Sequence, residues 1–276
     1  VDDCSTEPDV RLLDRIPGVV VARTPTNSGF VGACNHGAGV ARGSMLLFLN
    51  NDTEVRDGAI DALAGSMLAD PRVGVVGPKL LFPDGTVQEA GGLVFEDASA
   101  WNYGRDEAAD LPRLNYARDV DFVSGAALLV DRALFEDAGG FDQRYAPAYY
   151  EDTDLCFAAA ARGRRVVYQP AAEVIHFEGV SYGTGHGDDK KSRQMRINEK
   201  RFAEKWHDRL SAHGPRAVDL ERQKERDVDL RVLVVDARMI TPDHDAGSVR
   251  MAHILFLLRD LGHKVDCVHD GIKGFE

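Results

Sequence analysis

The chain has 276 residues, of which 44% are hydrophobic and 28% are charged, the composition of an ordinary soluble globular protein that can bury a substantial core. Its formal net charge of -12 argues against general nucleic-acid binding, because that function requires a basic face. No apolar stretch approaches the length that spans a bilayer, so no membrane-spanning helix is expected.

Strand and helix patterns alternate along the first 210 residues. Apolar and β-branched runs predict strands at residues 19–22, 45–49, 73–76, 122–130, 165–168 and 173–176. Helical patterns that end at glycine or before proline predict helices at residues 29–42, 59–69, 154–162 and 190–210. This alternation predicts a largely parallel sheet covered by helices.

Three other segments have distinctive compositions: one is polar and irregular, one is glycine-rich and one is basic. Residues 97–118 are irregular and polar and are interpreted as a loop over a ligand crevice. A glycine-rich segment at residues 179–187 follows the strand that ends at His176. The lysines and arginines of residues 190–210 form either a solvated face or a surface that attracts a diphosphate or an anionic membrane.

The composition changes after residue 210. Residues 211–229 mix Pro215 with dense alternating charge and predict a linker. Strands predicted at residues 231–235 and 264–268 flank an amphipathic helix at residues 248–261, which makes a βαβ unit too small for a stable core. The chain opens on Val1 without an initiator methionine, so we expect it to be a fragment of something longer.

The four cysteines are scattered along the chain. No pair has the spacing of a zinc site or a redox dithiol, so reduced thiols in a cytoplasmic protein are expected. The cysteines are Cys4, Cys34, Cys156 and Cys267.

The first of two acidic segments, residues 50–54, follows the apolar run of residues 45–49. An uninterrupted apolar run predicts a strand buried on both faces, so Asp52 should emerge where that strand leaves the sheet, at the edge where α/β proteins bind ligands. Asn50, Asp52 and Glu54 offer oxygen ligands, which suit magnesium, manganese or calcium better than zinc. The alternative is a polar turn whose acids cap the next helix.

The second acidic segment contains Glu151 and Asp152, and it would bring a general base to the same crevice. Small residues at 124–126 interrupt a predicted strand and would let a ligand approach the backbone, although a simple bulge explains them equally well. His176 ends another strand, where a histidine is either structural or a metal ligand.

These motifs occur in the order found in the family-two glycosyltransferases, nucleotide-sugar enzymes of the GT-A fold, which residues 1 to about 206 resemble. The resemblance implies that Asp52 and His176 are metal ligands, in a DxD-type site whose first acid is replaced by Asn50. It implies that Asp152, in an ED motif, is the catalytic base, and that Asp3 contacts the nucleotide base. The residues that it places at the donor are Asp3, Asn27, Gly29, Asn35, Asn51, Ser124, Gly125 and Glu151.

The resemblance also implies a fold and an activity. The fold would be α/β, a GT-A fold with a nucleotide-sugar-binding, Rossmann-like mixed sheet and helices on both faces, here lacking its first strand. The activity would be inverting transfer of a sugar from a nucleoside-diphosphate sugar to a hydroxyl of a glycan or lipid-linked acceptor, with Mg or Mn as cofactor. Its setting would be bacterial surface polysaccharide synthesis at the inner face of the cell membrane.

The terminal βαβ unit resembles the start of a GT-B glycosyltransferase of the family-four kind, with residues 245–248 at the beginning of its helix. The expected boundaries are therefore a GT-A domain at 1–210, a charged linker at 211–229 and an incomplete Rossmann-like domain at 230–276. Two alternative functions stay open. One is a non-catalytic GT-A module that binds a nucleotide sugar or acts as a scaffold, and the other is a sugar nucleotidyltransferase.

Overall fold

The structure is a computed structural model that describes residues 1–6, 8–177, 187–228, 230–236 and 239–269. The chain divides into two compact units, Val1–Val218 and Asp219–Glu276. This division falls inside the segment that the sequence predicts as a linker. Residues 178–186, most of the predicted glycine-rich segment, lie outside the described residues.

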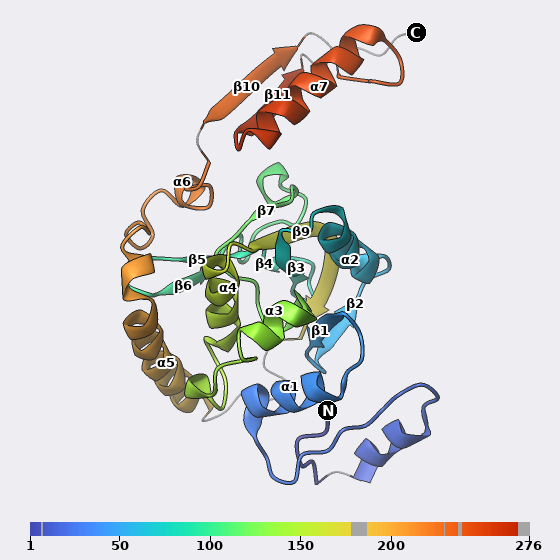
Figure 1. Cartoon of the computed structure of the whole chain (residues 1–276), viewed down its shortest axis with the longest axis vertical. Coiled ribbons are helices and arrows are strands. Elements are labelled where there is room, and N and C mark those ends of the chain that lie inside the picture. The colour runs from blue at the N-terminus through green and yellow to red at the C-terminus, as the bar shows by residue number, and fades with distance from the viewer. Residues whose placement is uncertain (7, 178–186, 229, 237–238, 270–276) are drawn as a thin grey trace. The chain divides into compact units, whose positions relative to one another are not determined.

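A seven-stranded sheet forms the centre of the first unit (Figure 1). Its main path runs in the order β1-β8-β3-β9-β2, with β4 paired to β3 and β7 paired to β9. The strands are β1 Met45–Leu49, β2 Thr53–Val55, β3 Val73–Leu81, β4 Val87–Glu89, β7 Arg118–Asp119, β8 Ala127–Asp131 and β9 Arg165–His176.

The strand directions in this sheet are mixed. Strand β3 runs parallel to β9, whereas the β1–β8, β3–β8 and β2–β9 pairs are antiparallel. The expectation of a largely parallel sheet is therefore wrong, and the mixed sheet is confirmed. Alternation of helices and strands does not fix strand direction here, because the long connection between β3 and β8 lets β8 enter the sheet from the opposite end.

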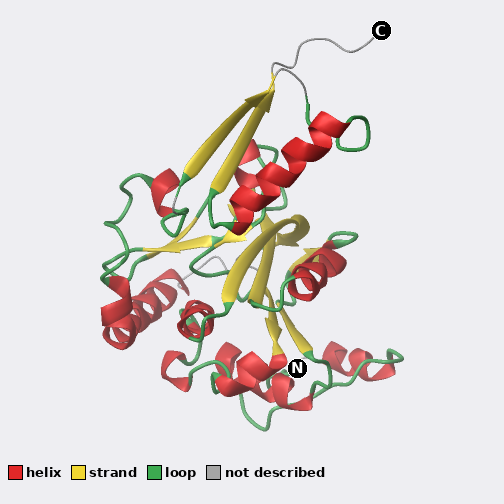
Figure 2. Cartoon of the chain, turned by 45° about the horizontal axis from the view of Figure 1, so that its top comes forward, coloured by secondary structure: helices red, strands yellow, loops and turns green. Residues whose placement is uncertain are grey.

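Helices cover both faces of the sheet (Figure 2). On one face lie α1 Gly29–Val40, α3 Arg132–Asp137, α4 Glu151–Ala161 and α5 Gly187–Leu210; on the other lies α2 Ala59–Ala69. In β1, Leu46 and Phe48 join the core beneath the first group, whereas Met45 and Leu47 pack toward α2. This alternation follows from the two-residue period of a strand buried on both faces.

Three predicted elements differ from the structure. The strands predicted at 165–168 and 173–176 form one strand, β9, because a register shift opposite Pro78 and Lys79 accommodates the residues around Pro170. The segment at 19–22 is not a strand; beside it the structure has a single bridge between Asp2 and Arg23. Residues 122–126 also lie outside β8, which begins at Ala127.

The predicted loop at 97–118 is largely ordered around short elements. It contains β6 Ala100–Asn102, which pairs with β5 Gly92–Val94, and the 3-10 helix η2 Pro112–Leu114. The buried Lys79 fixes it to the sheet, since its Nζ donates to Oδ1 of Asn115 at 2.8 Å and lies 2.9 Å from Oε1 of Glu173. Two further 3-10 helices are η1 Pro8–Arg15 and η3 Gln143–Tyr145.

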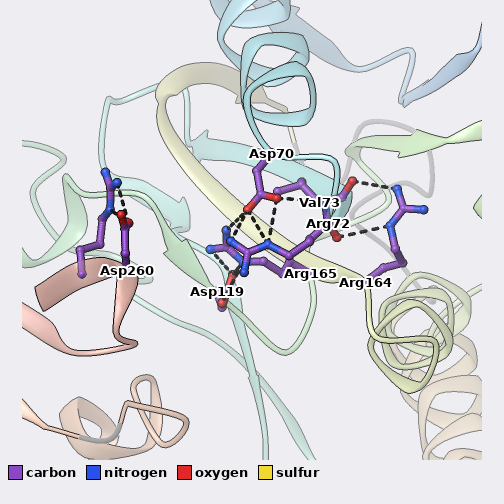
Figure 3. Close-up of polar contacts among 8 residues, drawn as sticks. Asp70, Arg72, Val73, Asp119, Arg164, Arg165 and Asp260 are labelled. Carbon is purple, nitrogen blue, oxygen red and sulfur yellow. Dashed lines mark hydrogen bonds and ion pairs between the residues drawn. The ribbon is translucent and has the colours of Figure 1, made fainter. Parts of the chain in front are cut away.

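An ion-pair network closes the end of the sheet where β3 and β9 begin (Figure 3). The guanidinium of Arg165 lies 2.8 Å from Asp70 and 2.8 Å from Asp119, and Arg72 lies 2.8 Å from Asp70. The hydrogen bonds from Arg72 and Arg165 lower the pKa of Asp70. The network therefore joins the end of α2 to β7 and β9.

The second unit is a small βαβ arrangement. Strands β10 Arg231–Asp236 and β11 Lys264–His269 pair in parallel, and α7 Ala246–Asp260 lies along them (Figures 1 and 2). Asp245 caps α7 by accepting a 2.8 Å hydrogen bond from the amide of Ser248. The predicted strand–helix–strand pattern is confirmed, and a short helix, α6 Leu220–Gln223, precedes it. Among the described residues, no helix has both the length and the apolarity to cross a membrane.

Candidate active site

The turn after β1 meets the end of β9. Strand β2 pairs with β9 so that Thr53 lies opposite His176, and the amide of Phe177 donates to the carbonyl of Asp52 at 2.9 Å. In consequence, Nε2 of His176 lies 3.3 Å from Oδ1 of Asp52 and 3.4 Å from Nδ2 of Asn50. The fold thus brings together two residues that are 124 positions apart in the chain (176 − 52) and that the sequence proposes as metal ligands.

Gln88 fixes the orientation of this histidine. Nδ1 of His176 lies 2.8 Å from Oε1 of the buried Gln88. Because a carboxamide oxygen can only accept, Nδ1 donates its proton in this contact, and Nε2 is the ring nitrogen that faces Asp52 and Asn50. The sequence analysis missed Gln88, because no motif marks a glutamine in a strand of three residues.

The residues at this corner suit a divalent cation. Nε2 of His176 and Oδ1 of Asp52 lie 3.3 Å apart, close enough for both to ligate one cation. No group of three or more His, Cys, Asp or Glu with metal-site geometry occurs in the described part of the chain. The carboxylate oxygen fits Mg²⁺ or Mn²⁺, and the imidazole nitrogen fits Mn²⁺, a transition metal, better than Mg²⁺; either ion takes further ligands from water and phosphate. Glu54, the other acid of this segment, is exposed and forms an ion pair with Arg56.

A second corner forms around residues 124–126. The amide of Gly125 donates to Oδ2 of Asp152 at 2.9 Å, and the amide of Ser124 donates to Oε1 of Glu89 at 3.0 Å. The carbonyl of Ala126 accepts from the amide of Asn50 at 2.9 Å. One short segment therefore connects the ED motif to the turn that carries Asp52.

Close packing explains the small residues of this segment. A Cβ on Gly125 would lie 3.1 Å from Cζ of Phe30 and 3.5 Å from Cβ of Asp152. The groups that approach the backbone here are therefore side chains of the protein itself. A side chain at position 125 would press on the ring of Phe30 and come into van der Waals contact with Cβ of Asp152.

A tightly held loop presents Asp152. Tyr149 and Tyr150 have φ of 79° and 74°, a conformation that non-glycine residues adopt only where surrounding contacts impose it. Asn198 of α5 supplies such contacts, since its buried Nδ2 lies 2.8 to 3.0 Å from the carbonyls of Tyr145, Ala148 and Tyr149, which share its two hydrogens. Helix α4 then begins at Glu151, so its acids lie at the positive end of the helix dipole.

Three acids near this corner have raised pKa values. Burial raises the pKa of Glu89 to about 8, with a further contribution from the charge of Asp152. Burial and the charge of Asp152 raise the pKa of Glu151 well above its ordinary value. Burial also raises the pKa of Asp152, against the hydrogen bonds that it accepts from Gly125 and Thr153. Clusters of perturbed acids are typical of functional sites.

The residues proposed for the donor side occupy different environments. Asp3 caps α1, because its carboxylate accepts from the amides of Ser28 at 2.9 Å and Gly29 at 2.8 Å. Burial opposes its ionisation, but hydrogen bonds from Thr24, Ser28 and Gly29 lower its pKa overall. Asn27 lies beside it, with Nδ2 3.4 Å from the carbonyl of Asp3.

Asn35 and Asn51 differ from these residues. Both ends of the Asn35 amide are engaged by the backbone of Phe141, at 2.8 and 2.9 Å, which gives Asn35 a packing role between α1 and the segment after α3. Asn51 is exposed in the turn between β1 and β2. The donor contacts of Asp3, Asn27, Gly29, Asn35 and Asn51 stay predictions.

Known proteins resemble the chain over parts of its length. It is 38% identical over 153 residues to the O-antigen biosynthesis protein RfbC of Myxococcus xanthus, which covers 53% of this chain and 12% of that protein. It is 32% identical over 196 residues to the N-acetylglucosaminyl-diphospho-decaprenol L-rhamnosyltransferase of Mycobacterium tuberculosis, with 62% of each chain covered. The chain thus spans less than two thirds of the length of either relative.

The fold has a counterpart among solved structures. The crystal structure of GalNAc-T7 with UDP, GalNAc and Mn²⁺ superposes with a TM-score of 0.60 at 17% identity, over 76% of this chain and 43% of that one. This likeness and the mixed, helix-covered sheet confirm the predicted GT-A fold. The family described as "Glycosyl transferase family 2" matches residues 1–138, half of the chain. The chain therefore belongs to glycosyl transferase family 2.

Proposed function

We propose that the protein transfers a sugar from a nucleoside-diphosphate sugar to an acceptor hydroxyl, with inversion and with the assistance of a divalent metal. One observation carries the proposal: residues 124–126 are hydrogen-bonded both to the carboxylate of Asp152 and to the turn that bears Asp52. In that turn, Asp52 lies beside His176. A base at one end of this segment and a cation site at the other suit a sugar transfer. The base would take the proton of the acceptor hydroxyl, and the cation would bind the diphosphate that leaves the sugar.

Asp52 and His176 would hold the metal, Mg²⁺ or Mn²⁺. When bound, such an ion supplies Lewis-acid stabilisation of the charge that develops on the leaving diphosphate. The protein's own contribution is to orient the two donors: the β2–β9 pairing places them side by side, and Gln88 keeps Nε2 of His176 available.

Asp152 would be the general base. Its Oδ2 is held by the amide of Gly125 and its Oδ1 by the amide and hydroxyl of Thr153, so the carboxylate is fixed before an acceptor binds. It would accept the proton of the acceptor hydroxyl as the new bond to the sugar forms. A single base acting opposite the leaving group gives one displacement and an inverted anomeric configuration.

The names of the relatives support the class of acceptor. One is named for O-antigen biosynthesis, and the other is named as an L-rhamnosyltransferase that acts on N-acetylglucosaminyl-diphospho-decaprenol. We therefore propose a glycan or lipid-linked saccharide as acceptor and bacterial surface polysaccharide synthesis as the setting, in the cytoplasm at the inner face of the membrane. The second unit, with its parallel βαβ arrangement, would be of the GT-B, family-four kind.

A non-catalytic GT-A module is the second candidate. It is favoured by the capping role of Asp3, whose carboxylate accepts from Thr24, Ser28 and Gly29, and by Asn50 in the position of an acid. Such a module would bind a nucleotide sugar without transferring it, so a turnover assay separates the two candidates.

The test measures nucleoside diphosphate released by the full-length protein from UDP-, GDP- and dTDP-sugars, with and without acceptor. Asp152→Asn should lower turnover by about two to four orders of magnitude while donor binding is retained, because only proton transfer is lost. Asp52→Ala and excess chelator should each abolish transfer. Glu136→Gln, an exposed acid on α3, is the matched control. Transfer that persists in Asp152→Asn removes the base, and donor binding without turnover in the unsubstituted protein favours the non-catalytic module.

A further inference from the structure

Glu89 is a buried acid that the proposed mechanism does not use. It ends β4, is 1% exposed, and its Oε1 accepts from the amide of Ser124 at 3.0 Å. The next amide along the chain, that of Gly125, donates to Oδ2 of Asp152 at 2.9 Å. The two carboxylates thus bind consecutive amides of one segment, which makes Glu89 an immediate neighbour of the proposed base.

The surroundings of the two acids differ in how well they stabilise a negative charge. Asp152 is partly exposed and accepts three hydrogen bonds, from the amide of Gly125 and from the amide and hydroxyl of Thr153. Glu89 accepts one, and its Oε2 is buried with no hydrogen-bond partner among the described residues. Two neighbouring carboxylates in a buried site cannot both ionise without a large cost, so the better-solvated one holds the charge.

Other charged and titratable groups near Glu89 do not change which of the two acids holds the negative charge. Arg118 of β7 and Arg105 favour the ionised form, yet burial outweighs them and the pKa of Glu89 rises to about 8. Cys156 of α4 and Tyr168 of β9 also face it, and burial raises the pKa of each, so both stay neutral. Asp152 is therefore the main negative charge that Glu89 faces.

We propose that Glu89 is a protonated positioning residue for Asp152: it carries the proton of the pair, leaves Asp152 ionised as the base, and holds the Ser124–Gly125 backbone that orients it. This inference rests on the proposed function. Loss of the proton from Glu89 would place a second negative charge beside Asp152 and repel the carboxylate that the Ser124–Gly125 backbone orients, so transfer should fail at alkaline pH.

The test is the dependence of kcat on pH, measured with Mg²⁺ and saturating donor and acceptor. In the unsubstituted protein kcat should fall as pH rises through about 8. Glu89→Gln keeps an oxygen for the Ser124 amide and cannot ionise. The kcat of this variant should therefore vary by less than about twofold between neutral pH and about pH 9.5. Glu89→Leu loses the contact with Ser124 and should lower kcat about tenfold or more at every pH. Glu136→Gln should keep the alkaline fall.

A second measurement does not depend on turnover. Because the pKa of Glu89 is higher in the folded protein than in the unfolded chain, the folded state holds the extra proton between about pH 4.5 and 8, and stability should fall as pH rises through that range. The urea midpoint should therefore decrease less between pH 6 and pH 9 in Glu89→Gln than in the unsubstituted protein.

An alkaline fall that persists unchanged in Glu89→Gln would overturn the proposal. So would a Glu89→Gln protein as inactive near neutral pH as Glu89→Leu, because that result would mean that the negative charge of Glu89 is required. Asp152→Asn in the same assay separates this failure from failure of the proposed function: if it transfers at full rate, the base itself is wrong, whatever Glu89 does.

Discussion

At the scale of single residues, Gln88 determines which nitrogen of His176 faces Asp52 and would therefore bind the proposed metal. Removing its Oε1 acceptor, 2.8 Å from Nδ1, frees the imidazole to rotate or change tautomer. We expect Gln88→Leu to weaken binding of Mn²⁺ by about 10- to 100-fold, the range typical of lost outer-shell partners. The measurement is Mn²⁺ titration by electron paramagnetic resonance in the presence of a nucleoside diphosphate.

Two controls accompany this prediction. Gln88→Glu keeps an acceptor for Nδ1 and should keep the affinity, whereas Gln143→Leu, an exposed glutamine in η3, should have no effect. Equal Mn²⁺ affinity in Gln88→Leu and the unsubstituted protein would show that the contact is only structural.

The sequence suggests residues that belong to motifs, and it does not reveal residues that act through contacts. Asp52, Asp152 and His176 are candidates, and stay predictions, because chemistry-bearing side chains follow strands or begin helices in a recognisable order. Gln88 and Glu89 lie in a three-residue strand with no distinctive pattern. Their roles arise from contacts with His176 and Ser124, which are 88 and 35 positions away.

At the scale of elements, helix α5 holds the loop that presents the base. The two hydrogens of the buried Asn198 amide are shared among three carbonyls of that loop. We expect Asn198→Leu to lower kcat about tenfold or more by loosening the approach to Asp152, and to lower the free energy of unfolding by about 1–3 kcal/mol because buried carbonyls lose their donor.

The kinetic readout distinguishes positioning from general destabilisation. At a temperature where the variant is fully folded, its KM for the donor should stay within about threefold of that of the unsubstituted protein. The reason is that the contacts of Asn198 lie in the loop before Asp152 and not at Asp52 or His176. Glu204→Gln on the exposed side of the same helix is the control. A kcat that matches the unsubstituted protein under those conditions would contradict a positioning role for α5.

The helices and their faces were well predicted at this scale, and the strand directions were not. Helix α2 has the predicted bounds, 59–69, and α7 differs by two residues at its start and one at its end. Periodicity reports which side of an element is buried, and it contains no information on which strand lies beside which. The antiparallel insertion of β8 between β1 and β3 is such a long-range property.

At the scale of the whole molecule, the two units differ in how completely they bury their apolar surface. The first unit has large buried clusters on both faces of its sheet. In the second unit, alternate residues of β10 remain exposed: Leu233 is 63% and Val235 is 74% accessible. A parallel sheet normally has helices on both faces, and among the described residues of this unit only α7 is long enough to cover one.

Because of this difference, we expect the first unit to fold on its own and the second not to. Residues 1–218 produced alone should unfold in one cooperative transition, because that unit has its own core. Residues 219–276 produced alone should lack a cooperative transition, since two strands and one helix bury too little apolar area to offset the conformational entropy of folding. Circular dichroism during urea titration measures both. A sigmoidal transition in residues 219–276 would show that the βαβ unit folds independently, and the predicted difference between the two units would then be wrong.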